Sequence, residues 1–347
     1  MKIDALMRGG PGEAPTEAAA TAASGFDGLH SSELQHDPFL LVARAVGGAP
    51  ELEYGTSIAV AFARSPMTVA YSAWDLQALT GGRFFLGLGS QVKAHIERRF
   101  SMPWSHPAAR MREYVLALRA IWASWQDGTK LDFDGEFYRH TLMTPMFSPG
   151  PLPSGPPRVL LAAVGDVMTR VAGEVADGLI AHSFTTRRYI REVTLPTLQA
   201  GLDRGGRDRK DFDLVYAPFV VTGADEKEMA ASAAVARERI AFYASTPSYR
   251  GVLELHGWGD LQTSLNALAR QGKWQEMGDL IDDEMLAEFA VVAPLGELPA
   301  AYATWVGGLA DRTSFTPPEG VGADATRELI GSIKAGIAEA AAQEPLA

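Results

Sequence analysis

A short apolar run, a polar or Gly/Pro turn and a segment with helical spacing follow one another along nearly the whole chain. In the helical segments, as at 65–79 and 112–125, apolar residues recur on one face. Eight runs read as strands, the last more weakly than the others: 2–7, 26–31, 52–60, 83–88, 158–163, 178–182, 212–222 and 312–316. Eight strands alternating with helices predict an α/β fold, a (β/α)8 TIM barrel.

The chain is longer than a plain barrel needs. A TIM barrel typically takes about 250 residues, and this chain has 347. The surplus falls at 127–157, where alternating apolar residues around Asp134-Gly135 predict a small hairpin, and at 245–288, which has a helical pattern and an HGWGD segment that looks exposed. Neither insertion resembles a separate domain, so we expect residues 1–347 to form one barrel domain.

Charge and composition exclude several classes of protein. Lys and Arg total 31 against 42 Asp and Glu, and the net charge of −11 disfavours binding to nucleic acid or to an anionic membrane. The chain has no cysteine, so disulfides, thiolate metal sites and a cysteine nucleophile are impossible. No signal peptide is recognisable, and no apolar run approaches the roughly 20 residues of a membrane span. We therefore expect a soluble cytoplasmic protein.

Chemistry in a TIM barrel is located at the carboxyl ends of the strands. Glu33 and His36 follow the second predicted strand, Ser57 and Ile58 lie at the end of the third, and the run GRFFLGLGSQ ends the fourth. This run is not a dinucleotide fingerprint, because Val92 occupies the place of the third glycine. Its small residues would instead let a flat ligand approach the backbone. The histidines near the barrel mouth lack the paired spacing of a metallohydrolase, so no metal site is predicted.

The turn after the fifth strand is a candidate anion site. It runs from a buried strand straight into a helix, which would leave the first backbone amides of the helix free to bind a phosphate. These amides belong to Val164, Gly165, Asp166 and Val167. Arg98 and Arg110 could assist an anion there. In the alternative interpretation, Asp166 caps its own helix and the arginines are solvated surface charges.

Four stretches of the chain together resemble a known family: GFDGLHSSELQHDPF, LEYGTSIAVAFARSPMTVAYSAWDLQALTGGRFFLGLGS, HPAARMREYVLALRAIW and PRVLLAAVGDVMTRVAGEVADGLI. They are similar to the bacterial luciferase-like flavin and deazaflavin oxidoreductases, most of all to the actinobacterial branch that uses coenzyme F420. The resemblance implies a TIM barrel that holds an isoalloxazine-type ring in its mouth and the cofactor phosphate on the turn after the fifth strand. It also implies a bulge and a cis peptide at Ser57-Ile58, behind the ring, and contacts from Ser90 and Gln91.

Two positions depart from the family pattern. Leu34 stands where relatives often have a histidine, and Val92 stands where sugar-phosphate dehydrogenases of the family carry an acid. The second departure disfavours sugar-phosphate oxidation. His36, Glu33 and Gln91, in that order, are the side chains that we expect along the path of a transferred hydride.

The resemblance implies an F420-dependent oxidoreductase that moves a hydride between the cofactor and a small-molecule substrate. One alternative is an FMN-dependent monooxygenase that uses oxygen and reduced flavin from a partner reductase. Another is a noncatalytic flavin-binding barrel, which the absence of a histidine at Leu34 favours. Relatives commonly form homodimers through the helices after the second and third strands, and a flavin or F420 reductase could supply electrons.

Overall fold

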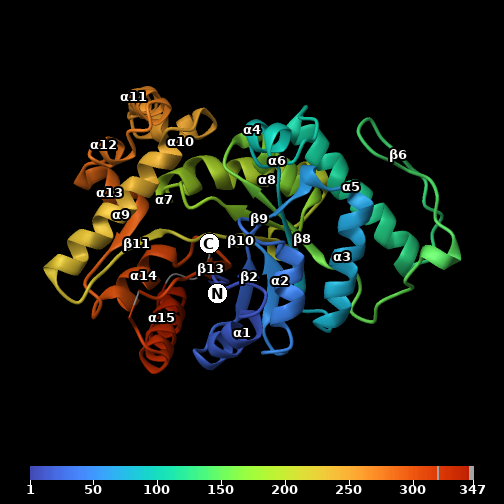
Figure 1. Ribbon diagram of the computed structural model, residues 1–347, viewed down its shortest axis with the longest axis horizontal. Coiled ribbons are helices and arrows are strands. Elements are labelled where there is room, and N and C mark those ends of the chain that lie inside the picture. Colours follow the sequence, from blue (N-terminus) through green and yellow to red (C-terminus); the bar gives the residue numbers. More distant parts are fainter. Residues whose placement is uncertain (319, 344–347) are drawn as a thin grey trace.

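The computed structural model describes residues 1–318 and 320–343 and contains a closed parallel barrel (Figure 1). The barrel strands follow one another in the order β3-β2-β1-β13-β10-β9-β8-β5-β4, and β3 also pairs with β5, which closes the ring. Their bounds are β1 Lys2–Leu6, β2 Gly28–Ser31, β3 Glu53–Thr56, β4 Ala59–Val60, β5 Phe84–Gly89, β8 Arg158–Ala163, β9 Gly178–Ala181, β10 Asp213–Val215 and β13 Arg312–Ser314. The predicted TIM barrel is confirmed.

The third barrel strand is interrupted. Its two pieces, β3 and β4, both pair with β5, where Tyr54 lies opposite Phe84 and Ala59 opposite Leu88. The third strand advances by five residues between these two pairs, whereas β5 advances by four. The third strand therefore carries one extra residue, which is a β-bulge. The bulge implied by the family resemblance is confirmed.

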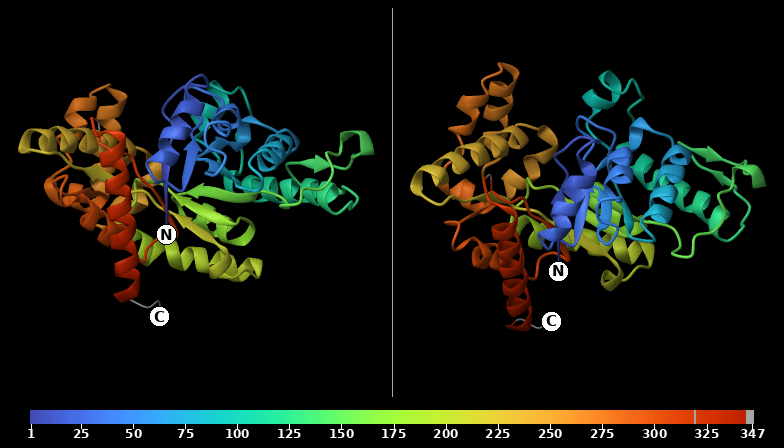
Figure 2. Two further views of the ribbon diagram at one scale, coloured as in Figure 1. Left: turned by 90° about the horizontal axis from the view of Figure 1, so that it is seen from below. Right: turned by 60° about the horizontal axis from the view of Figure 1, so that its bottom comes forward.

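Helices cover the outside of the barrel and connect its strands (Figures 1 and 2). They are α1 Ala14–Ala23, α2 Pro38–Ala45, α3 Pro66–Leu79, α4 Lys93–Arg98, α5 Pro107–Gln126, α6 Asp166–Val175, α7 Arg187–Tyr189, α8 Leu195–Gly205, α14 Leu298–Val306 and α15 Ala323–Gln343. The helix predicted over 65–79 is α3, whose N-cap Ser65 accepts a hydrogen bond from the amide of Thr68. The helix predicted over 112–125 begins earlier, at Pro107, since proline suits a first helical turn.

The strand predicted over 212–222 is two strands. Only β10 belongs to the barrel, whereas β11 (Phe219–Val221) forms a separate parallel pair with β12 (Ala290–Val292). Between β10 and β11 lies Pro218, which has no amide hydrogen to donate to a continued strand ladder. The sequence shows one apolar run at 212–222, so it does not indicate the point at which the chain leaves the barrel.

The first insertion contains the predicted hairpin. Strands β6 (Phe133–Asp134) and β7 (Arg139–His140) pair antiparallel and project away from the barrel (Figures 1 and 2). Glu113 of α5 holds the turn, because its carboxylate accepts hydrogen bonds of 2.6 to 2.9 Å from three successive amides, those of residues 136–138.

The second insertion is helical and is larger than predicted. It contains α9 (Glu226–Ala244), α10 (Arg250–Leu255), α11 (Gly259–Arg270), α12 (Trp274–Gly278) and α13 (Asp283–Phe289), and it begins and ends at the β11–β12 pair. These elements share an apolar cluster of their own, to which the segment after β9 contributes Phe184 and Tyr189. The expectation that HGWGD is exposed is wrong for its histidine, since the His256 side chain is only 6% exposed. His256 stacks on Trp258 and shares a 2.8 Å hydrogen bond with Thr186.

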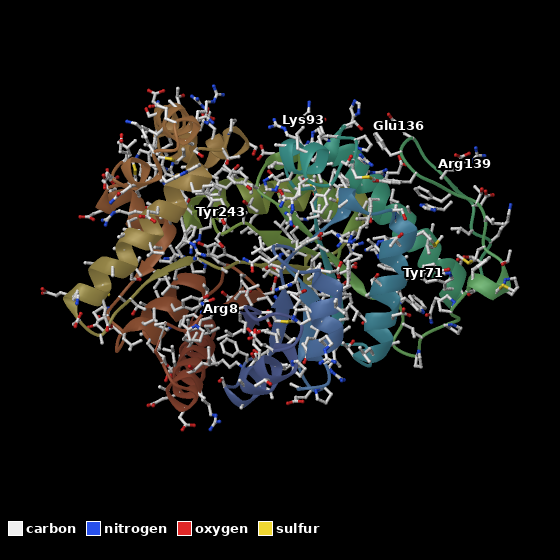
Figure 3. The ribbon with its side chains drawn as sticks, viewed as in Figure 1. Arg8, Tyr71, Lys93, Glu136, Arg139 and Tyr243 are labelled. Atoms are coloured by element: carbon white, nitrogen blue, oxygen red, sulfur yellow. The ribbon has the colours of Figure 1, made fainter. Side chains whose placement is uncertain are left out.

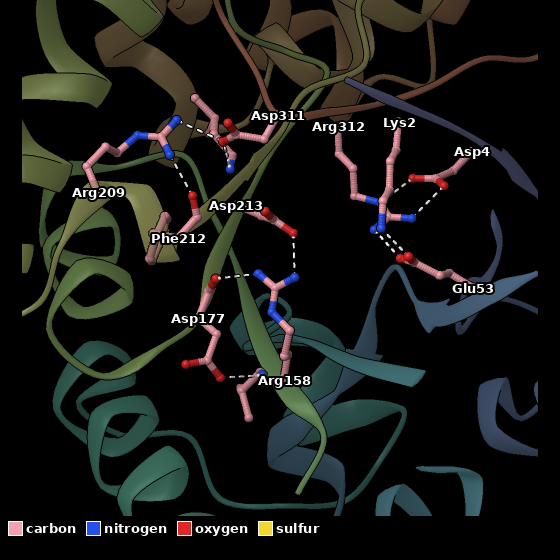
Figure 4. A network of polar contacts seen from close by, with 12 residues as sticks. Lys2, Asp4, Glu53, Arg158, Asp177, Arg209, Phe212, Asp213, Asp311 and Arg312 are labelled. Atoms are coloured by element: carbon pink, nitrogen blue, oxygen red, sulfur yellow. Dashed lines mark hydrogen bonds and ion pairs between the residues drawn. The ribbon is translucent and has the colours of Figure 1, made fainter. Parts of the chain in front are cut away.

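Three aspartates tie neighbouring strands together at the amino ends of the barrel strands. Asp27, Asp177 and Asp311 each precede a strand and accept a hydrogen bond of 2.7 to 2.9 Å from an amide at the start of the adjacent strand. Each also pairs with a base, as Asp177 does with Arg119. The pair of Asp311 with Arg209 is drawn in Figure 4. Burial alone would raise the pKa of Asp177, but its arginines and the Val159 amide outweigh burial and lower it.

A buried ion-pair cluster lies close to this end of the barrel (Figure 4). The Arg312 side chain is 2% exposed and binds both carboxylate oxygens of Asp4, at 2.6 and 2.8 Å, and Glu53 at 2.6 Å. Lys2 also pairs with Glu53. His30 lies beside Asp4, and burial lowers its pKa to about 4. Since the chemistry of TIM barrels is at the opposite end, we assign this cluster to stability.

Candidate functional site

The Ser57-Ile58 peptide bond at the end of β3 is cis, as the family resemblance implies. The end of β2 and the loop after it form three hydrogen bonds with this peptide. The amide of Ser57 donates to the carbonyl of Ser31 at 2.7 Å, the amide of Glu33 donates to the carbonyl of Ile58 at 3.2 Å, and the Ser32 hydroxyl donates to the carbonyl of Ser57 at 2.8 Å. A side chain on Gly89 would meet Ile58 at 2.8 Å, so the end of β5 packs closely against this peptide. The structure therefore brings Ser57 and Ile58 next to the end of β5, where Ser90 and Gln91 follow.

Glu33 lies at this site, but its carboxylate is already bound. One oxygen accepts hydrogen bonds of 2.7 Å from the amide of Val60 and from Arg64. Arg64 also pairs with Asp37 at 2.8 Å, and Asp37 caps α2. Only 8% of Glu33 is exposed. This arrangement fixes the bulged third strand to the loop after β2. A role for Glu33 in proton transfer stays a prediction.

His36 and Leu34 are both exposed on the same loop. The Nε2 atom of His36 lies 3.4 Å from the position that a Cβ on Gly10 would occupy, so the ring borders the loop between β1 and α1. Leu34 is 71% exposed, and its carbonyl accepts a 2.8 Å hydrogen bond from Arg99. The imidazole of His36 is therefore accessible, and its role as a proton carrier stays a prediction.

Ser90 and Gln91 continue from β5 in an unusual backbone conformation. Gln91 has a φ of 60°, a left-handed value that is uncommon outside glycine. Its side-chain oxygen accepts a 3.1 Å hydrogen bond from the amide of Val92, and its carbonyl accepts one of 3.1 Å from the Ser90 hydroxyl. These bonds turn the chain sharply away from the strand end. Contacts of these two residues with a cofactor or substrate stay predictions.

The amino end of α6 is open. Gly165 is its N-cap, and no side chain in the described part of the chain caps it. Asp166, in the first turn, does not do so, so the alternative in which Asp166 caps its own helix is wrong. A Cβ built on Gly165 meets nothing within 4 Å. The backbone amides from Val164 to Val167 lie at this end of α6. Their geometry and the sign of the helix dipole suit an anion.

The two arginines predicted to assist this turn differ. Arg98 is exposed on α4. Arg110 binds the Tyr138 hydroxyl at 2.8 Å and the Pro103 carbonyl at 2.7 Å, and its guanidinium lies over the Phe62 ring. Arg110 thus joins the first insertion to the barrel. Participation of either arginine in an anion site stays a prediction.

His182 is a candidate that the sequence placed only near the barrel mouth. It follows β9, and its Nδ1 accepts a 2.9 Å hydrogen bond from the amide of Phe184. Burial lowers its pKa to about 4, so the ring is neutral at pH 7 with its proton on Nε2. Tyr243 of α9, labelled in Figure 3, and Tyr249 pack against it, with ring centroids at 4.5 and 5.0 Å. The signal in the sequence was a histidine directly after a strand, but its aromatic neighbours come from the insertion.

This strand end can do limited chemistry without a cofactor. It offers open amides at α6, a neutral imidazole NH at His182 and an exposed imidazole at His36. Within residues 1–318 and 320–343, no three or more His, Asp or Glu side chains are placed to hold a metal ion. No helix of the same residues is long and apolar enough to cross a membrane.

Comparison with known proteins finds relatives that match most of this chain. The chain is 53% identical over 312 residues to an uncharacterized protein of Mycobacterium tuberculosis, and the match covers 90% of this chain and 92% of that relative. It is 28% identical over 247 residues, 69% of each chain, to 5,10-methylenetetrahydromethanopterin reductase of Archaeoglobus fulgidus. The structure of the coenzyme F420-dependent tetrahydromethanopterin reductase from Methanopyrus kandleri superimposes with a TM-score of 0.76 at 17% identity, over 95% of this chain and 96% of that one.

The sequence model of the luciferase-like monooxygenases matches residues 5–312, nearly the whole barrel with both insertions. That match agrees with the closed eight-stranded barrel. The chain therefore belongs to the luciferase-like monooxygenase family and is an oxidoreductase of that family.

Proposed function

We propose that this protein is an F420-dependent oxidoreductase that transfers a hydride between the deazaflavin and a small organic substrate. The observation that carries the proposal is the open amino end of α6, where free amides and an uncrowded Gly165 fit a cofactor phosphate. The proposal is supported by the similar structure from Methanopyrus kandleri, which is described as a coenzyme F420-dependent reductase.

When bound, F420 would supply the hydride acceptor or donor. The chain would contribute the rest. The amides of Val164 to Val167 would hold the phosphate, and the Ser57-Ile58 segment with Ser90 would back the ring. The neutral His182 would offer an NH to an oxygen of the substrate, and His36 would exchange a proton with solvent.

A second candidate is an FMN-dependent monooxygenase, which the description of the matching family favours. A direct comparison separates the two cofactors. F420 and FMN are titrated into the protein, and the fluorescence of each is followed. We expect F420 to bind more tightly, and tighter binding of FMN would support the monooxygenase.

The phosphate position is tested with Gly165→Leu. A Cβ at Gly165 meets no atom within 4 Å, so we expect the fold of Gly165→Leu to persist while the approach of the phosphate is blocked. Loss of two hydrogen bonds to a charged group, at roughly 1.5 kcal/mol or more each, should weaken F420 binding by about 100-fold or more. Gly296→Leu is the matched control, because a Cβ there also meets nothing within 4 Å. Equal F420 affinity in both variants would place the phosphate elsewhere.

A further inference from the structure

A polar cavity is lined by none of the site residues described above. It has a volume of about 300 Å³ and is bordered by the segment after β9, by α13 and by α14. Arg187, Arg188 and Arg191 come from the first of these elements, Glu288 from α13 and Trp305 from α14. The segment that contains His182 thus supplies, a few residues later, three arginines that line this cavity.

The charges of this cavity do not balance. Arg188 pairs with Glu192 at 3.0 Å. Arg187 and Arg191 have no carboxylate oxygen within 4.0 Å among the described residues. Glu288, the other acid of the cavity, lies 4.0 Å from His256. Within residues 1–318 and 320–343, two guanidinium groups of this cavity therefore have no ion pair, in a protein whose overall charge is −11.

Arg187 is held in place although no carboxylate in the described part of the chain forms an ion pair with it. Its guanidinium lies 5.5 Å from the centre of the Trp305 ring, and the Trp305 indole donates a 3.3 Å hydrogen bond to the Tyr216 hydroxyl. The Nε atom of Arg187 is buried and has no hydrogen-bond partner in the described structure. Burial, and then the nearby charge of Arg191, lower the pKa of Arg187. Glu288 acts in the opposite direction on this pKa. The two like charges of Arg187 and Arg191 repel each other, and an anion bound between them would relieve that repulsion.

We propose that this cavity binds an anion, the phosphate or carboxylate group of a small molecule, between Arg187 and Arg191. The planar guanidinium of Arg187, fixed over Trp305, can present two NH groups to such a group. The lining of this cavity includes no residue of α6.

The test measures the binding of inorganic phosphate by isothermal titration calorimetry at low ionic strength. Every protein in the series carries Gly165→Leu, which blocks the α6 site. Adding Arg187→Gln should weaken phosphate binding at least tenfold. Adding Arg139→Gln changes the net charge equally, but on the hairpin far from this cavity, and should change the affinity less than twofold (Figure 3). Equal losses in the two variants, or no loss in Arg187→Gln, would overturn the proposal.

Two further measurements separate a binding site from a structural role and from the cofactor. Without phosphate, Arg187→Gln should melt at about the same temperature as its parent, since the lost contact with the Trp305 ring and the relieved repulsion with Arg191 oppose each other; a clearly lower melting temperature would mean that Arg187 has a structural role. In the protein without Gly165→Leu, saturation with F420 should leave phosphate binding at this cavity intact. Displacement of phosphate by F420 would assign the cavity to the cofactor instead.

Discussion

His182 should make the stability of this protein depend on pH. In the folded protein burial lowers its pKa to about 4, whereas in the unfolded chain the value returns to about 6.5. Between these values the unfolded state takes up a proton that the folded state does not. Stability is therefore unaffected by His182 above pH 6.5 and falls as the pH drops from 6.5 towards 4.

The size of the effect follows from the two pKa values. Each pH unit within this window costs about 1.4 kcal/mol, so lowering the pH from 7 to 5 should cost about 2 kcal/mol through His182 alone. His30 acts in the same direction, because burial also lowers its pKa to about 4. Both histidines should therefore contribute to loss of stability in mild acid.

Urea denaturation at pH 7 and pH 5 measures this linkage. In His182→Asn the amide oxygen can still accept the hydrogen bond from Phe184, but the group no longer titrates. The loss of unfolding free energy between the two pH values should be about 2 kcal/mol smaller in His182→Asn than in the wild type. His36→Asn is the control, since His36 is exposed. An unchanged pH dependence in His182→Asn would refute the reasoning.

Three other perturbations test the barrel and its strand end. Arg312→Leu leaves Asp4 buried without its partner and should lower the unfolding free energy by about 3 to 5 kcal/mol in urea; a loss below about 1 kcal/mol would contradict the role of the cluster. Glu33→Gln removes the charge that Arg64 faces and should lower the unfolding free energy by about 1 to 3 kcal/mol, so an unchanged melting curve would show the pair to be unimportant. His36→Ala should lose about 10² to 10⁴-fold in kcat with an unchanged melting temperature, and near-normal kcat would remove His36 from the mechanism.

The barrel was predictable because its signals are local. Each strand is a short apolar run and each helix has an apolar face, so counting them suffices to identify the fold. The prediction failed at 212–222, where β10 and β11 form one apolar run but belong to different sheets. Partner choice between strands is a long-range property, and the only local hint is Pro218. The same limitation explains why the second insertion was predicted to begin at 245, although its apolar cluster already includes β11.

The candidate site was only partly predictable, for a related reason. Residues placed by a strand end, such as Ser57, Ile58 and Gly165, could be located from the order of the strands. Whether a side chain is free to act or already hydrogen-bonded, however, depends on residues from elsewhere in the chain. Glu33 is 31 residues from Arg64, the base that occupies its carboxylate.

The second insertion contributes side chains to the strand end. Tyr243 and Tyr249 pack on His182 and exclude water from it, which keeps the imidazole neutral at pH 7. The same insertion supplies His256, which bonds Thr186 in the segment that leads to Arg187. A change in this insertion would therefore alter the packing around His182 and the segment that leads to the arginine cavity together, while the barrel strands remained as they are. Substrate preference in this protein should accordingly follow the insertion, and exchange of the insertion with that of a relative should change the substrate without a change of cofactor.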